Sequence, residues 1–234
     1  MRAARLAAVV VAIFDLALGG ERITPAMAVR DLATLSVFLE EYEANVVDLT
    51  GQTVTHWAAS TGATEAIDYA IGQGADLERA DVDGRRPLHI AALSGHAEAV
   101  AHLLMRGARA DAQDKAGALP LHRAALAGSA GAVRALVQAA PGAVDARLLR
   151  THGTALHAAA YLGHMAVLEA LLEAGASPCL RNRDGELPID RYVEEDDDKV
   201  ALIADEPRVV DEAVRDRVVT LLRGGTRGCA GGDL

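Results

Sequence analysis

Apolar residues recur three and four positions apart in several short stretches of the chain, which is the spacing of one buried face of an α-helix. The pattern is clearest in residues 99–104 and 166–172, and these stretches are followed by the glycines Gly107 and Gly175. Glycine is typical of a helix end because it adopts the left-handed backbone conformation at little cost. The pattern therefore predicts short amphipathic helices that end at turns.

A second pattern repeats along the chain with a period near 33 residues. Each block contains a histidine, then small residues that include an alanine pair, and then a glycine. The histidines follow one another at intervals of 33, 33 and 35 residues, and the glycines recur in the same steps: His56, His89, His122 and His157, with Gly62, Gly95, Gly128 and Gly163. Such regular spacing predicts a repeat protein in which each unit is one supersecondary motif.

Local signals mark where the elements of one unit begin. Pro87 and Pro120 suit the first position of a helix, where the N–H that proline lacks would have been unpaired. Residues 81–84 and 114–117 run from an aspartate to a glycine, and such a carboxylate bonds nearby backbone N–H groups in a turn. We expect these turn sequences to form the tips of projecting hairpins.

The period and the Pro-Leu-His-x-Ala core together resemble the ankyrin repeat family, whose unit is a turn followed by two antiparallel helices. The matches lie in phase over roughly residues 48–190. The resemblance implies an all-α fold, an α-solenoid of helix-turn-helix units with projecting hairpin loops, with four clear repeats plus two degenerate caps. The expected divisions are an N-terminal apolar segment 1–20, a cap repeat 21–47, repeats 48–80, 81–113, 114–148 and 149–181, a C-terminal cap repeat 182–225 with an acidic insert 194–208, and a flexible tail 226–234.

The sequence departs from the repeat between the third and fourth units. Two residues are inserted around residues 140–142, and Leu149 and His152 stand where the aspartate and glycine of the turn are expected. We therefore expect a distorted hairpin there. In the caps, residues 24–27 fit a first helix, while residues 35–39 and 218–222 fit second helices.

Composition and charge narrow the possible partners. Only 3% of residues are aromatic while 51% are hydrophobic, so the core must be built from small and aliphatic side chains. The formal net charge is -10, and residues 190–234 hold 12 acidic and 7 basic residues. We expect no nucleic-acid surface, because phosphate binding needs a basic excess. The acidic run 194–198 lacks the alternating ligand spacing of a calcium loop and predicts a solvated loop.

The N-terminus and the cysteines bear on the compartment. Arg2 and Arg5 precede an apolar run over residues 6–14, an outline shared by a secretory signal and by a capping helix. The run is well short of the roughly 20 residues that a membrane span needs. Cys179 and Cys229 form no disulfide framework by spacing, and we expect reduced thiols. The expected location is the cytoplasm, with secretion as the alternative if residues 1–19 are a signal peptide.

The histidines invite a metal or catalytic interpretation, but the resemblance places most of them in the architecture. It implies that the repeated histidines bond the backbone of the neighbouring turn, and that His96 and His164 lie near the contact between repeats. His102 and His152 have no assigned role, and we expect His102 on the surface. No zinc-ligand spacing, nucleophile elbow or phosphate loop occurs. We therefore expect no enzyme activity, cofactor, metal or small-molecule substrate.

The resemblance also implies where a partner binds: on second, third and fifth turn positions such as Leu49 and Val82, and near the end of each first helix. Arg85, Lys115, Arg150 and Arg183 are the expected basic contacts on the hairpin tips, and Leu93, Leu126, Tyr161 and Leu162 form an apolar strip beside them. We expect a monomeric adaptor or scaffold whose protein partner has acidic and apolar character. The alternatives are a secreted or host-directed effector and an inhibitory subunit acting through the acidic region 194–216.

Overall fold

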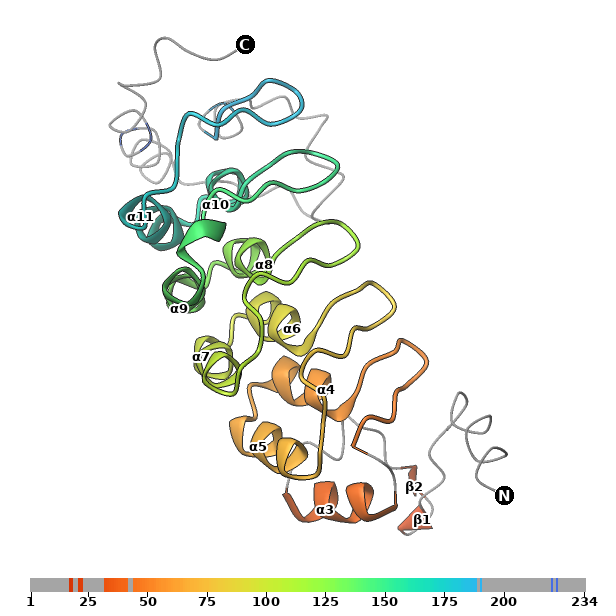
Figure 1. Cartoon of the computed structure of the whole chain (residues 1–234). Coiled ribbons are helices and arrows are strands. Elements are labelled where there is room, and N and C mark those ends of the chain that lie inside the picture. Colours follow the sequence, from red (N-terminus) through yellow and green to blue (C-terminus); the bar gives the residue numbers. More distant parts are fainter. Residues whose placement is uncertain are drawn as a thin grey trace.

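The computed structural model describes residues 17–18, 21–22, 32–41, 44–188, 190, 220 and 222. Over residues 54–173 it is a stack of helix pairs with hairpin loops projecting from one side (Figure 1). The helices nearest the loops, called inner helices here, are α4 (Val54–Thr61), α6 (Pro87–Leu93), α8 (Pro120–Ala127) and α10 (Ala155–Leu162). Behind them lie the outer helices α5 (Thr64–Gly72), α7 (Ala97–Met105), α9 (Ala130–Ala139) and α11 (Met165–Glu173). The expected all-α repeat solenoid is confirmed.

The N-terminal end of the described chain has one further helix and two very short strands. Helix α3 (Leu32–Glu41) packs against α5 and covers the first helix pair. Strands β1 (Ala17–Leu18) and β2 (Glu21–Arg22) pair antiparallel, so residues 17 and 18 are extended rather than part of a capping helix. The rest of the apolar segment, residues 24–27 and the acidic insert 194–208 lie outside the described residues.

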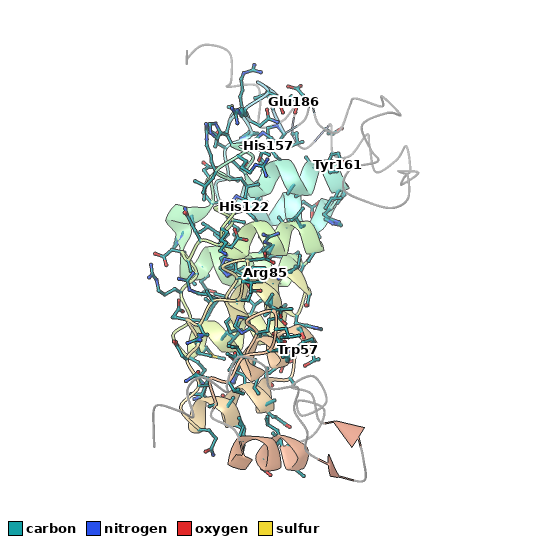
Figure 2. The ribbon with its side chains drawn as sticks, turned by 90° about the vertical axis from the view of Figure 1, so that its right-hand side faces the viewer. Trp57, Arg85, His122, His157, Tyr161 and Glu186 are labelled. Carbon is teal, nitrogen blue, oxygen red and sulfur yellow. The ribbon has the colours of Figure 1, made fainter. Side chains whose placement is uncertain are left out.

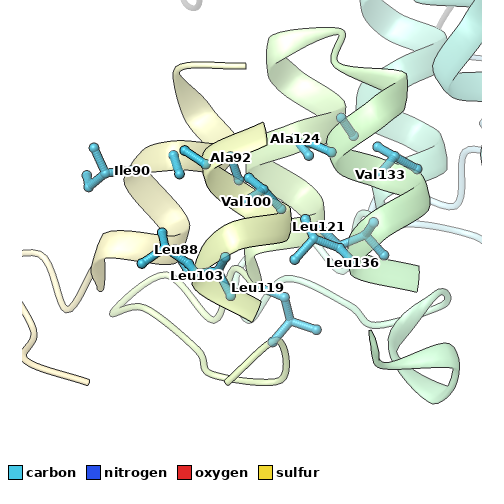
Figure 3. Packing of buried hydrophobic residues seen from close by; sticks show 14 of the residues in the cluster. Leu88, Ile90, Ala92, Val100, Leu103, Leu119, Leu121, Ala124, Val133 and Leu136 are labelled. Atoms are coloured by element: carbon cyan, nitrogen blue, oxygen red, sulfur yellow. The ribbon is translucent and has the colours of Figure 1, made fainter. Parts of the chain in front are cut away.

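The core is a single hydrophobic cluster that runs through the stack. Ala91, Ala92, Ala124 and Ala125 are fully buried on the inner helices α6 and α8, which therefore pack closely. Larger side chains fill the space between inner and outer helices, as Figure 3 shows for α6 to α9. Each fully buried leucine, such as Leu103, contributes about 1.5–3 kcal/mol relative to an exposed one. The composition predicted a core of small and aliphatic side chains. In the structure alanines line the contacts between neighbouring inner helices, and larger aliphatic side chains lie behind them.

The irregular junction between the third and fourth repeats begins with a 3₁₀ turn, η2 (Pro141–Ala143). In a regular hairpin the first residue donates its N–H to the carbonyl four residues on, as Asp81 does to Arg85 at 2.8 Å. Here Leu148 donates to Gly153, five residues on, at 3.0 Å. One inserted residue therefore lies in the hairpin and the other precedes it.

The structure also bears on the cysteine and membrane expectations. Cys179 is disulfide-bonded, so the expectation of a reduced thiol is wrong for this residue, and Cys229 lies outside the described part of the chain. Among the described residues no helix combines the length and apolar character needed to cross a membrane.

Candidate protein-interaction surface

The hairpin tips are residues 48–52, 81–85, 114–118, 148–153 and 182–186, and all but the fourth, which begins with Leu148, are held in shape by the side chain of their first residue. In the second tip Oδ1 of Asp81 accepts the N–H groups of Asp83 at 2.9 Å and Arg85 at 2.8 Å. Asp48, Asp114 and Asn182 make the same pair of bonds in their own tips. The tips are therefore rigid turns rather than loose loops.

These bonds also set the ionisation of the tip carboxylates. Burial alone would raise the pKa of Asp81, but the donated N–H groups and the Arg85 guanidinium outweigh it, and the pKa is lowered. The pKa values of Asp48 and Asp114 are lowered against burial in the same way, by hydrogen bonds from neighbouring backbone and side chains. All three carboxylates are charged and committed to the turns at neutral pH.

One backbone hydrogen bond joins each pair of neighbouring tips. The second residue of a tip donates its N–H to the carbonyl of the third residue of the tip before it, as Lys115 does to Asp83 at 3.0 Å. Two more such bonds run from Val82 to Thr50 at 3.0 Å and from Leu149 to Ala116 at 3.2 Å. Arg183 donates to Thr151 at 2.8 Å, the fourth residue of the longer fourth tip. The bonds give the tips a common register whose second positions are Leu49, Val82, Lys115, Leu149 and Arg183.

This register corrects the expected alignment of the fourth tip. Leu148 takes the place of the turn aspartate, and Leu149, which was expected there, takes the second place. Arg150 is then the inserted residue rather than the equivalent of Lys115. His152 takes the place of the turn glycine with a backbone φ of +54°, and among the described residues no other non-glycine has a positive φ.

Each repeated histidine joins its own repeat to the next. In α6 the backbone N–H of Arg86 donates to Nδ1 of His89 at 3.2 Å, while Nε2 of His89 lies 3.1 Å from the carbonyl oxygen of Ala118. A backbone N–H only donates and a carbonyl only accepts, so the ring must be neutral with its hydrogen on Nε2. His56 and His157 bridge in the same way, to the carbonyls of Arg85 and Glu186.

His122 departs from the pattern at the irregular junction. Its Nε2 bonds the carbonyl of Ala146, which precedes the hairpin, at 3.0 Å. Burial lowers the pKa of His122 and of His89 to about 4, and it lowers the pKa of His56 as well. These three rings are uncharged at neutral pH and have both nitrogens engaged, which leaves neither nitrogen for proton transfer to a substrate.

The histidines that follow the helix-ending glycines lie at the contact between repeats. Nε2 of His96 lies 3.0 Å from the carbonyl of Ser60, and Nε2 of His164 lies 3.2 Å from that of Leu126. Ser129 stands at the equivalent place and donates to the carbonyl of Gly95 at 3.0 Å. These side chains hold each inner helix end to the next repeat.

His102 has a role that sequence reasoning missed. It was expected on the surface, but it is half-buried and its Nε2 lies 2.7 Å from Oδ1 of Asp68 on the preceding outer helix. Arg106 reaches the same oxygen at 2.8 Å. The available signal was the separation of 34 residues between Asp68 and His102, about one repeat.

The structure places the expected contact residues on the tips and the inner helices. Figure 2 looks onto the tips, and its labelled side chains from Trp57 to Glu186 follow one another along the stack. Lys115, Arg150 and Arg183 are exposed, whereas the Arg85 guanidinium pairs with Asp81 at 2.9 Å and with Asp83 at 2.8 Å. Of the apolar strip, Leu93 is exposed, and Leu126, Tyr161 and Leu162 are half-buried.

The largest exposed apolar side chains on the tips stand at the second position. Leu49 is 78% exposed, Val82 52% and Leu149 62%. Leu149 was not among the expected contacts because it was placed at the turn aspartate. Within the described residues no group of three or more His, Cys, Asp or Glu side chains gathers in a way that could hold a metal ion.

The family model for ankyrin repeats in three copies matches residues 26–114 and 101–182. These matches cover more than half of the chain, and the protein belongs to the ankyrin repeat family. Ankyrin repeats are generally protein-interaction modules, and the family is generally non-catalytic. A comparison with curated proteins finds no match.

Proposed function

We propose that this chain is a non-catalytic adaptor that binds a partner protein on its tip face, meaning the hairpin tips and the exposed side of the inner helices. In a stacked solenoid this is the concave surface along which partners dock. The proposal assigns binding to the tip face and leaves the outer helices to support it.

The observation that carries the proposal is the row of exposed apolar side chains at the second tip position. Leu49, Val82 and Leu149 are exposed on tips whose backbone is bonded within the tip and to the neighbouring tip. Leu49 and Val82 stand on adjoining tips, while Lys115 separates Val82 from Leu149. Large apolar side chains exposed on adjoining turns are a feature of interaction sites. Leu93, at the end of the inner helix α6, is a further exposed apolar side chain.

The rigidity of the hairpin tips also favours binding on the tip face. The turn carboxylates, the bonds between tips and the bridging histidines fix the tip backbone before any partner arrives. A surface that is already ordered loses little conformational entropy on binding, which favours affinity.

The test compares a triple apolar-to-polar variant of the full chain with a single-substitution control, each immobilised as bait for affinity capture. The tip variant carries Leu49→Ser, Val82→Ser and Leu149→Ser. The control is Met105→Ser, which removes a side chain 76% exposed at the end of the outer helix α7. Thermal melts establish that both variants stay folded, as expected for surface substitutions.

Mass spectrometry then compares what each bait captures. We expect the tip variant to lose the specific partner and Met105→Ser to keep it. Capture that survives the tip variant and is lost with Met105→Ser would place binding on the outer helices and contradict the proposal.

A further inference from the structure

The charge of the tips changes from one end of the stack to the other. The first two tips carry a single cation, Arg85, which two carboxylates of its own tip neutralise. Around the last two tips the exposed cations form a group, called the basic tip cluster here: Arg147, Arg150, Arg181 and Arg183. This group of like charges stands out in a chain whose net charge is -10.

Hydrogen bonds place Arg150 and Arg183 of the cluster on adjoining tips. Arg183 donates its N–H to the carbonyl of Thr151 at 2.8 Å, and its Nη1 lies 3.4 Å from the carbonyl oxygen of Arg150. Lys115 of the third tip is not part of this group, because its Nζ reaches back to the second tip and donates to the carbonyl of Val82. Arg147 and Arg181 stand at equivalent places, directly before the first residues of the fourth and fifth tips.

The carboxylates near the cluster do not balance it. Asp184 is exposed in the fifth tip, and Glu186 is half-buried with Oε2 accepting the Asn182 amide at 2.7 Å. The inserted residue of the fourth tip is itself a cation, Arg150. Positive charge is thus concentrated at one end of the tip row, while Leu49 and Val82 give the other end an apolar surface.

We infer that the partner presents a segment with an acidic part and an apolar part, the acidic part seated on the basic tip cluster and the apolar part on the first two tips. This inference rests on the proposed function and adds the chemistry and the placement of the partner. A protein segment fits better than a nucleic acid, because the chain's net negative charge repels a polyanion while a short acidic stretch meets the cluster alone.

The probe is a synthetic peptide with a glutamate-rich half and a leucine-containing half, labelled with a fluorophore. Binding to the full chain is measured by anisotropy against a peptide in which lysine replaces every glutamate. The charge-reversal variant carries Arg147→Glu, Arg150→Glu and Arg183→Glu. Its matched control is Arg134→Glu, an exposed arginine on the outer helix α9.

We expect the glutamate peptide to bind and the lysine peptide not to bind. Exposed charge pairs contribute little singly, but three reversals together should weaken binding by about tenfold or more, and more strongly at low salt. Arg134→Glu should leave the affinity unchanged. A photocrosslinker on the glutamate half should label residues 147–153 or 181–186, and one on the leucine half should label residues 48–52 or 81–85.

Several outcomes overturn the inference. Equal weakening by Arg134→Glu, equal binding of the lysine peptide, or crosslinks in the opposite order would each do so. Binding of a single-stranded oligonucleotide as tight as that of the peptide would point to a nucleic acid. If replacing the chain's own acidic run 194–198 with Gly and Ser raised the peptide affinity about tenfold, that run would be the occupant instead.

The experiments also distinguish failure of this inference from failure of the proposed function. If the tip variant abolishes partner capture while the charge-reversal variant captures normally, the tip face binds the partner but the acidic assignment is wrong. If neither variant affects capture, both statements fall.

Discussion

Nε2 of His89 lies 3.1 Å from the carbonyl oxygen of Ala118, and this contact ties the inner helix of one repeat to the hairpin of the next. The same ring accepts the N–H of Arg86 at the start of its own helix. One buried side chain thus satisfies two backbone groups that would otherwise lie unpaired. His56 and His157 make the same link, and His122 bonds the carbonyl of Ala146 just before the irregular hairpin, so the stack is stabilised by a line of neutral imidazoles.

Removing one of these rings should be costly. His89→Ala leaves a buried N–H and a buried carbonyl without partners and opens a cavity, so we expect the free energy of unfolding to fall by about 2–4 kcal/mol. Urea unfolding followed by circular dichroism measures the change. The control is His152→Asn at an exposed tip position, where the change should stay within about 0.5 kcal/mol. A loss for His89→Ala no larger than for the control would contradict the assigned role.

The line of histidines also predicts how stability depends on pH. The pKa of His89 and of His122 is about 4 in the folded chain, against an ordinary value of 6.5. Between these values the unfolded chain binds protons that the folded chain does not, so the free energy of unfolding falls as the pH falls from about 6.5 towards 4. Each fully buried ring contributes a slope of up to about 1.4 kcal/mol per pH unit.

Urea titrations across this window measure the slope. The turn carboxylates, whose pKa values lie below 3.8, lose their contribution only at lower pH and do not mask the effect. His89→Gln keeps a hydrogen-bond acceptor but does not titrate, so its slope should be smaller by about one proton. A stability that is flat from neutral pH to about 4 would rule out buried neutral histidines.

Two helix-ending glycines with the same backbone conformation but different surroundings allow a direct comparison of alanine substitutions. Gly95 and Gly128 have φ values of +76° and +73°, so alanine at either should cost about 1 kcal/mol for the left-handed backbone. A Cβ at Gly95 would meet nothing closer than 3.9 Å, whereas one at Gly128 would lie 2.9 Å from the ring of His164. That ring is held by its bond to Leu126.

We therefore expect Gly128→Ala to destabilise the chain by about 1–2 kcal/mol more than Gly95→Ala, because the ring must shift. Thermal or urea unfolding of the two variants compares them directly. Equal losses would show that the histidine ring moves without cost and that the close contact has no energetic importance.

The fourth tip offers a stabilising substitution. His152 is exposed and adopts the left-handed φ that the other tips give to glycine. His152→Gly should relieve this strain and raise the free energy of unfolding by about 0.5–1 kcal/mol after the added flexibility of the unfolded chain is counted. Arg150→Gly, at a neighbouring position without a positive φ, should lower stability by a similar amount. A stabilisation by Arg150→Gly equal to that by His152→Gly would contradict the strain argument.

The features that sequence alone identified are those encoded by local chemistry. Pro87 and Pro120 begin inner helices, and Gly62 and Gly128 end them with left-handed φ, because each of these roles depends on the residue's own backbone preference. The bridging histidines could be assigned through the family resemblance, since the same residue recurs at the same place. The regular spacing of these residues was therefore sufficient to predict the repeat architecture.

The remaining features depend on relations that spacing does not encode. Leu149 was placed one position wrong because the hydrogen bond that closes the hairpin, rather than the length of the insertion, decides its register. His102 and Asp68 are separated by about one repeat, but the pair occurs once, so the spacing alone did not distinguish it from two unrelated surface residues. Arg85 was expected to face a partner, but its charge is engaged by carboxylates of its own turn, which only the side-chain geometry reveals.

The most direct test of the central claim is hydrogen–deuterium exchange of the full chain with and without its captured partner. If the partner binds the tip face, exchange should slow in residues 48–52, 81–85, 114–118, 148–153 and 182–186 and towards the ends of the inner helices, while the outer helices α5, α7, α9 and α11 stay unchanged. Protection confined to the outer helices would contradict the account.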